Sequence, residues 1–98
     1  MVGSVFVSGG NILKFEALFS NLSNDLYPDL VIESPQGTKY GYALTNPSIY
    51  PGGGSYNGYS LNPEIMTFNS PEAGTWKIWI NNQPSTITSS FIVKHIVD

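Results

Sequence analysis

The chain has 98 residues, enough for one domain built around a single core. It lacks cysteine, which excludes disulfides and thiolate metal sites. Its four lysines, without any arginine, face seven acids for a formal net charge of −3. A nucleic-acid binder needs clustered cations, so that class is excluded. No apolar run approaches the roughly 20 residues that span a bilayer, so we expect no membrane span.

The first part of the chain is predicted to form short strands separated by turns. Residues 5–7 are a brief apolar strand that ends at two glycines. Residues 12–19 alternate in polarity, which favours a strand over the main alternative, a helix. The expected inward side chains of this strand are Leu13, Phe15, Ala17 and Phe19.

A β-hairpin is predicted after a polar loop at residues 20–28. Residues 30–33 form its first strand, and the Ser-Pro-Gln-Gly sequence at 34–37 suits a tight turn. Residues 38–44 return as the second strand, with Tyr40, Tyr42 and Leu44 expected on one face. Residues 45–63 follow as a long loop. Its three consecutive glycines argue against a strand there.

The stretch at residues 68–80 organises the predicted fold. Pro71 and Gly74 suit a turn, and alternation begins after it. Trp76, together with Ile78 and Ile80, is expected to face the core, while Trp79 faces outward with Lys77.

The remaining segments complete an all-β pattern. Residues 64–69 form a strand with Met66 and Phe68 inside, residues 81–85 form a turn, and residues 87–97 form the closing strand. About seven to eight short strands separated by turns predict a single antiparallel β-sandwich, jelly-roll-like, over residues 1–98.

Two segments carry a family resemblance. The first is residues 25–38, Asp-Leu-Tyr-Pro-Asp-Leu-Val-Ile-Glu-Ser-Pro-Gln-Gly-Thr, and the second is residues 67–76, Thr-Phe-Asn-Ser-Pro-Glu-Ala-Gly-Thr-Trp. Their order along the chain and the spacing between them match one family pattern. Together they resemble the bacterial and archaeal pre-peptidase C-terminal (PPC) domain and the related P domain of subtilisin-like proprotein convertases. The resemblance implies a non-catalytic accessory domain of a secreted hydrolase or microbial surface protein.

Catalytic groups are sparse. His95 is the single histidine and is expected to be a structural strand residue. Asp29 and Glu64 are the acids that a paired-carboxylate mechanism would use, but no pattern distinguishes them. We therefore expect no enzymatic activity.

A calcium site is predicted in the acidic loop. Its candidate ligands are Asn24, Asp25 and Asp29, with Asn21 nearby, because calcium prefers carboxylate and amide oxygens. Members of the resembled family often bind calcium, although they commonly carry an aspartate where this chain has Tyr27. The alternative is that Asp29 accepts hydrogen bonds from its own loop.

Aromatic side chains are the candidate ligand-binding residues. Tyr50, Tyr56 and Tyr59 in the long loop, with Trp79, are predicted to form a stacking platform. Alternatively, the tyrosines fold back over the sandwich edge and the loop covers Trp79. The predicted function is contact with a polysaccharide or protein at the cell surface or outside the cell. The alternative is stabilisation of an adjacent protease domain.

Overall fold

The computed structural model describes residues 3–19, 29–58, 63–81 and 91–97, which contain eight strands and one short 3₁₀ helix. The strands are β1 (Gly3–Val7), β2 (Ile12–Phe19), β3 (Asp29–Glu33), β4 (Lys39–Tyr40), β5 (Gly54–Tyr56), β6 (Glu64–Asn69), β7 (Gly74–Asn81) and β8 (Phe91–Val97). The helix is η1 (Pro47–Ile49).

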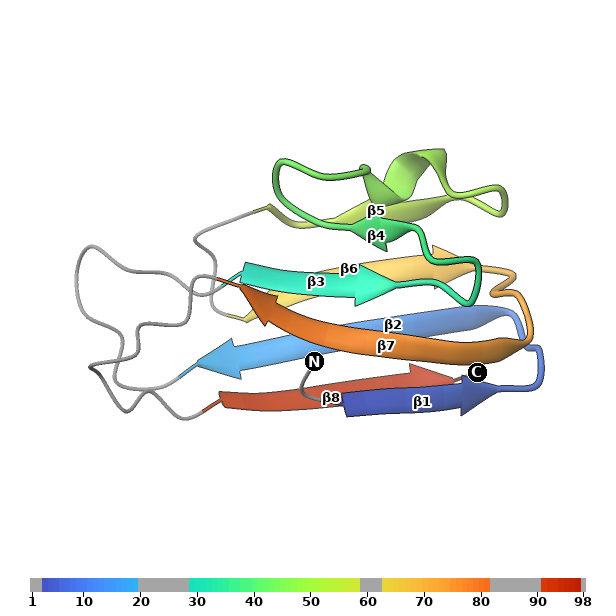
Figure 1. Ribbon diagram of the computed structural model, residues 1–98, viewed down its shortest axis with the longest axis horizontal. Coiled ribbons are helices and arrows are strands. Elements are labelled where there is room, and N and C mark those ends of the chain that lie inside the picture. Colours follow the sequence, from blue (N-terminus) through green and yellow to red (C-terminus); the bar gives the residue numbers. More distant parts are fainter. Residues whose placement is uncertain (1–2, 20–28, 59–62, 82–90, 98) are drawn as a thin grey trace.

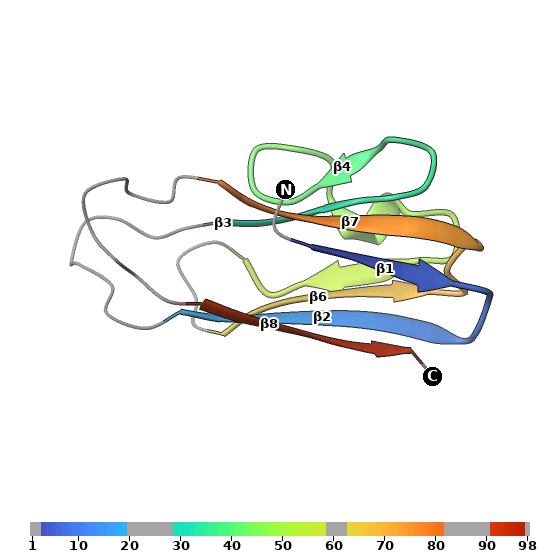
Figure 2. The same cartoon turned by 60° about the horizontal axis from the view of Figure 1, so that its bottom comes forward.

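The strands form two antiparallel sheets that pack face to face. One sheet has the order β1-β7-β3-β4 and the other β5-β6-β2-β8. Figure 1 shows β1 and β8 along one side of the sandwich and β4 and β5 along the other. Figure 2 shows the two layers, with β3, β4 and β7 above β2, β6 and β8. The predicted antiparallel β-sandwich is therefore confirmed.

Trp76 lies at the centre of the core, as the alternation in β7 predicts. Its side chain is fully buried, and its ring centroid lies 4.9 Å from that of Phe68 and 5.6 Å from that of Tyr50. Its indole N–H donates a hydrogen bond to the Glu72 carbonyl oxygen, 3.0 Å away, so the polar atom is satisfied inside the core. Ile78 is buried beside it.

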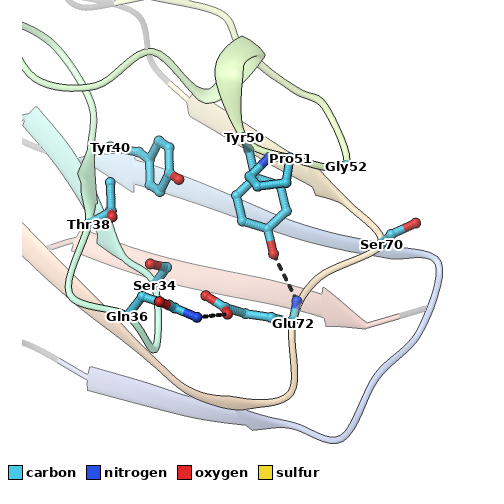
Figure 3. Close-up of a pocket in the computed structure, with 9 residues that line it drawn as sticks. All are labelled: Ser34, Gln36, Thr38, Tyr40, Tyr50, Pro51, Gly52, Ser70 and Glu72. Atoms are coloured by element: carbon cyan, nitrogen blue, oxygen red, sulfur yellow. Dashed lines mark hydrogen bonds between the residues drawn. The ribbon is translucent and has the colours of Figure 1, made fainter.

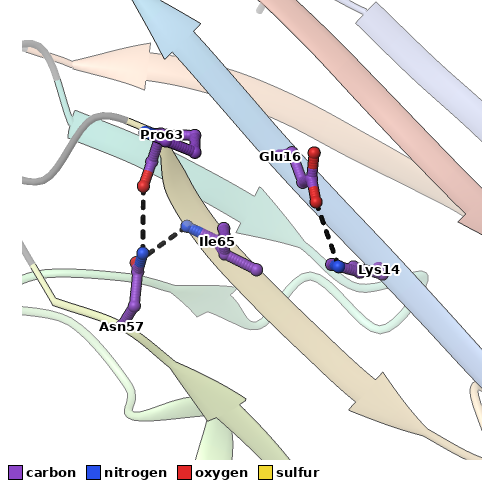
Figure 4. Close-up of polar contacts among 5 residues, drawn as sticks. All are labelled: Lys14, Glu16, Asn57, Pro63 and Ile65. Atoms are coloured by element: carbon purple, nitrogen blue, oxygen red, sulfur yellow. Dashed lines mark hydrogen bonds and ion pairs between the residues drawn. The ribbon is translucent and has the colours of Figure 1, made fainter.

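Strand β2 also follows its sequence pattern. Leu13, Phe15 and Ala17 are completely buried, which confirms the strand over the helical alternative. Lys14 and Glu16 alternate with them on the outer face and form an ion pair of 3.0 Å (Figure 4). This pair is partly exposed, so it contributes little to stability.

The predicted hairpin forms, but its second strand is much shorter than expected. Strand β4 contains only Lys39 and Tyr40, and the chain then turns away at Gly41. A Cβ atom at Gly41 would lie 2.9 Å from the Leu30 carbonyl oxygen, so only glycine permits this approach. Tyr42 and Leu44 are consequently exposed, and the prediction that they share a face with Tyr40 is wrong.

The long segment at residues 45–63 is more regular than predicted. Asn46 caps η1 by accepting a hydrogen bond from the Ser48 N–H at 2.9 Å, and the glycine run leads into β5. The inference that glycine excludes a strand here is wrong. A Cβ atom at Gly54 would lie 2.4 Å from the Thr67 carbonyl oxygen, so the missing side chain allows β5 to pack closely.

Asn57 follows β5 and joins it to the start of β6. Its side-chain amide donates to the Pro63 carbonyl oxygen at 2.9 Å, and its side-chain oxygen accepts from the Ile65 N–H at 2.7 Å (Figure 4). These two bonds fix the ends of the intervening connection. Strand β6 then forms as predicted, with Met66 and Phe68 fully buried.

The closing strand β8 pairs with β2, and its described part begins at Phe91. The predicted strand start at residues 87–90, and most of the predicted turn at 81–85, lie outside the described residues, as does the loop at 20–28. Within the described ranges, no helix has the length and apolar character that crossing a bilayer requires.

Candidate functional site

The turn between β3 and β4 and the turn between β6 and β7 are far apart along the chain but meet at one end of the sandwich. The Gln36 side-chain amide donates to a Glu72 carboxylate oxygen at 3.1 Å. A Cβ atom at Gly74 would lie 2.8 Å from the Pro35 ring, so glycine is needed where the turns touch. The turns that carry the family resemblance therefore form one unit.

A third turn, at residues 50–53, completes this end of the molecule. The Tyr50 hydroxyl accepts a hydrogen bond from the Glu72 backbone N–H at 2.8 Å. The Gly53 N–H donates to the Tyr50 carbonyl oxygen at 2.7 Å and closes the turn. A Cβ atom at Gly52 would lie 2.1 Å from the Asn69 carbonyl oxygen, so this turn lies directly against the end of β6.

The three turns enclose a pocket of about 400 Å³, here called the three-turn pocket. Figure 3 shows Gln36 and the Tyr50 hydroxyl directed toward Glu72, whereas the Ser70 hydroxyl points away from them. The lining residues are Ser34, Gln36, Thr38, Tyr40, Tyr50, Pro51, Gly52, Ser70 and Glu72. Hydroxyl groups predominate, with one amide and one carboxylate. Such a lining both donates and accepts hydrogen bonds.

The electrostatics of the three-turn pocket are simple. Glu72 is the single ionisable acid among the lining side chains, and no lysine lines the pocket. Burial raises the pKa of Tyr40 and of Tyr50 above the ordinary value of 10.0, so both hydroxyls stay protonated at neutral pH. The pocket is therefore polar and weakly anionic.

A second polar cluster surrounds Glu64, at the opposite end of the sandwich. Glu64 is completely buried, and one of its carboxylate oxygens accepts a hydrogen bond from the Leu30 N–H at 3.0 Å. The other oxygen accepts a hydrogen bond from the Tyr56 hydroxyl. Burial raises the pKa of Glu64 to about 7, although both hydrogen bonds favour the ionised form, and the charge of Asp29 adds to the increase.

Glu64 is the partner of a backbone N–H near the start of β3. Strand β3 lies between β7 and β4, and β4 ends opposite Ile32. The Leu30 N–H lies outside this paired stretch, and Glu64 from the opposite sheet satisfies it.

The predicted aromatic residues do not come together as one platform within the described structure. Tyr50 is 6% exposed and lines the three-turn pocket, whereas Tyr56 binds Glu64 at the other end. Trp79 lies on the outer face of β7, where its indole N–H donates to Glu33 at 2.9 Å. The Lys39 ammonium lies 4.3 Å from the Trp79 ring centroid. Tyr59 lies outside the described residues.

The predicted calcium ligands are only partly described. Asp29 is the first residue of β3 and is 7% exposed, while Asn24 and Asp25 lie outside the described residues. Among the described residues, no group of three acidic, histidine or cysteine side chains could hold a metal ion. The calcium site remains a prediction.

The residues considered for catalysis lie in two places. Asp29 and Glu64 lie near each other, but Glu64 has no accessible surface for a substrate to contact. His95 lies on β8 opposite Phe15, and its side chain is outside the described part.

Sequence reasoning missed Gln36, Ser70 and Glu72 as pocket residues. All three lie in the two turns that contain proline and glycine. Each is a polar residue next to a proline, and this feature of the sequence could have indicated them as pocket residues. Comparison with family models, with curated proteins and with solved structures finds no match for this chain.

Proposed function

We propose that this chain is a non-catalytic binding module of a secreted or cell-surface microbial protein, and that the three-turn pocket holds part of a polysaccharide. The observation that carries the proposal is the lining of this pocket, to which three turns and strand β4 contribute five hydroxyl-bearing residues, one amide and one carboxylate. The resemblance of two of these turns to the PPC domain supports an accessory role.

The lining favours an uncharged glycan over a peptide or an acidic glycan. Sugar hydroxyls donate and accept hydrogen bonds, as do the hydroxyls of Ser34, Thr38 and Ser70. Glu72 would repel a sulfate or uronate, and no lysine in the lining offsets that repulsion. The volume of about 400 Å³ admits a short stretch of sugar rings rather than a folded partner.

Binding is tested on an array of neutral and acidic oligosaccharides, followed by calorimetry with the strongest ligand. Replacing Glu72 by Gln keeps its shape but removes its charge, so we expect about 10- to 100-fold weaker binding. The matched control is Glu16→Gln on the outer face of β2, which should bind like the wild type. Equal retention of glycans by wild type and Glu72→Gln, or no retention above background, contradicts the proposal.

Contact with an adjacent domain is a second candidate function, because two large apolar side chains are openly displayed. Phe6 on edge strand β1 is 72% exposed, and Ile49 in η1 is 71% exposed. In a longer protein containing this chain, Phe6→Ser should lower the melting temperature of the neighbouring domain, not that of the isolated chain. If Phe6→Ser leaves the melting temperature of the neighbouring domain unchanged, the proposed contact with that domain is contradicted.

A further inference from the structure

Glu64 joins three strands through one carboxyl group. It belongs to β6, whereas the Leu30 N–H that it accepts belongs to β3 in the opposite sheet. Its second partner, the Tyr56 hydroxyl, belongs to the edge strand β5. The carboxyl group therefore links the two sheets to each other and β5 to both.

The surroundings of Glu64 disfavour a negative charge. Asp29 lies next to Leu30 and adds like charge. From β2, Ala17 faces Glu64, while Lys14 and Glu16 pair on the outer face. Tyr56 is the one titratable group that β5 presents, and within the described residues Glu64 forms no ion pair.

Strand β8 lies on the far side of β2 from β6. It carries Lys94 and His95, whose side chains are outside the described part of the chain. The groups known to act on the Glu64 carboxyl are therefore one acid, one phenol and one backbone amide.

We propose that Glu64 is a proton-operated clasp, which holds β5 and the start of β3 against β6 when its carboxyl group is protonated and loosens them when the proton leaves. In the protonated state the buried group is neutral, and its two oxygens can still accept from Leu30 and Tyr56. In the ionised state the same group is a buried charge beside Asp29, which opposes packing.

The direction of the pH dependence follows from the two states of the chain. In the folded chain the pKa of Glu64 is about 7, above the value of 4.5 that it has when exposed. The folded state therefore binds the proton more tightly than the unfolded state. The stability that protonation of Glu64 contributes to the folded state is fully present below pH 4.5 and is lost as the pH rises through about 7.

The first test compares the melting temperature of wild type and Glu64→Gln between pH 5 and pH 8. Glutamine is neutral at every pH, with one oxygen that accepts and an NH2 group that donates, so the variant's melting temperature should lack the decrease of about 5 °C or more expected for the wild type. At pH 8 the variant should melt above the wild type. Glu16→Gln, which alters charge on the outer face, should keep the wild-type decrease. An equal decrease in Glu64→Gln overturns the proposal.

The second test uses the wild type alone, so it holds even if the variant does not fold. Carbon NMR of the Glu64 carboxyl should show its titration close to pH 7, and a midpoint below pH 5 overturns the proposal. Hydrogen exchange at the Leu30 amide, corrected for its intrinsic pH dependence, should accelerate at least 10-fold from pH 5 to pH 8. The Gly37 amide, which donates to the Ser34 carbonyl oxygen at the pocket end, is the reference. Its corrected exchange rate should not increase between the two pH values.

Discussion

The two ends of the sandwich each contain a glutamate, but the two glutamates have opposite surroundings. Glu72 lies in a turn, is partly exposed, accepts from Gln36 and lines the three-turn pocket. Glu64 is completely buried between the sheets and accepts hydrogen bonds from the Leu30 N–H and the Tyr56 hydroxyl. The same type of side chain is thus partly exposed in a pocket at one end and buried in the core at the other. Burial, rather than residue type, separates the two roles.

The largest expected effect belongs to Trp76 at the centre of the core. Trp76→Ala would leave a large cavity beside Phe68 and Tyr50, and we expect a loss of roughly 3 to 5 kcal/mol in the free energy of unfolding. Chemical denaturation measures it. Trp79→Ala on the outer face is the matched control and should cost clearly less. Equal costs for the two tryptophans would mean that the core is not centred on Trp76.

The attachment of β5 comes next. Gly54→Ala places a Cβ atom 2.4 Å from the Thr67 carbonyl oxygen and 2.7 Å from that of Pro47, so backbone must move. We expect a loss of about 1 to 3 kcal/mol in the free energy of unfolding. Gly3→Ala, whose nearest contact is an Ile78 methyl group at 3.7 Å, is the control and should be nearly neutral. A tolerated Gly54→Ala would show that β5 does not lie so close to its neighbours.

Tyr56→Phe tests the Glu64 end directly. The change removes one of the two donors to the carboxyl group, and that loss matters most where the proposed clasp is closed, with Glu64 protonated. We therefore expect a loss of about 1 to 2 kcal/mol in the free energy of unfolding at pH 5 and a smaller one at pH 8, where the contact is already loosened. Urea denaturation at both pH values measures the difference. An equal loss at both pH values would show that the contribution of the Tyr56 hydroxyl to stability does not depend on the ionisation of Glu64.

The smallest expected effect on stability is at Glu72. Glu72→Gln retains the turn and most of its contacts, so the free energy of unfolding should change by less than about 0.5 kcal/mol. Binding of a neutral oligosaccharide should nonetheless weaken. A large loss of stability in this variant would erase the contrast between the two ends of the molecule.

Much of the sandwich was predictable because period-two alternation reports directly on a half-buried strand. Phe15 in β2 and Trp76 in β7 were placed in the core on that basis, and both are fully buried. The turn at 34–37 followed from proline and glycine, whose backbone preferences are local. These features depend on neighbours along the chain.

The features that escaped prediction depend on contacts distant in sequence. Gly41 ends β4 because of the Leu30 carbonyl oxygen, and Gly54 fits a strand because of Thr67. No sequence pattern distinguishes Glu64, yet it is buried and accepts a hydrogen bond from Leu30, which is 34 residues away in the chain. The three-turn pocket likewise requires turns that are more than 30 residues apart, such as those of Gln36 and Glu72, to meet.

The contact between Pro35 and Gly74 also constrains how such a module could be altered. The proline ring occupies the space that a side chain at position 74 would need, so each turn is shaped to fit the other. An insertion in one turn would separate Gln36 from Glu72 unless the other turn changed to match. Grafting either turn onto a related sandwich would therefore require both turns to be transplanted together, as a single unit.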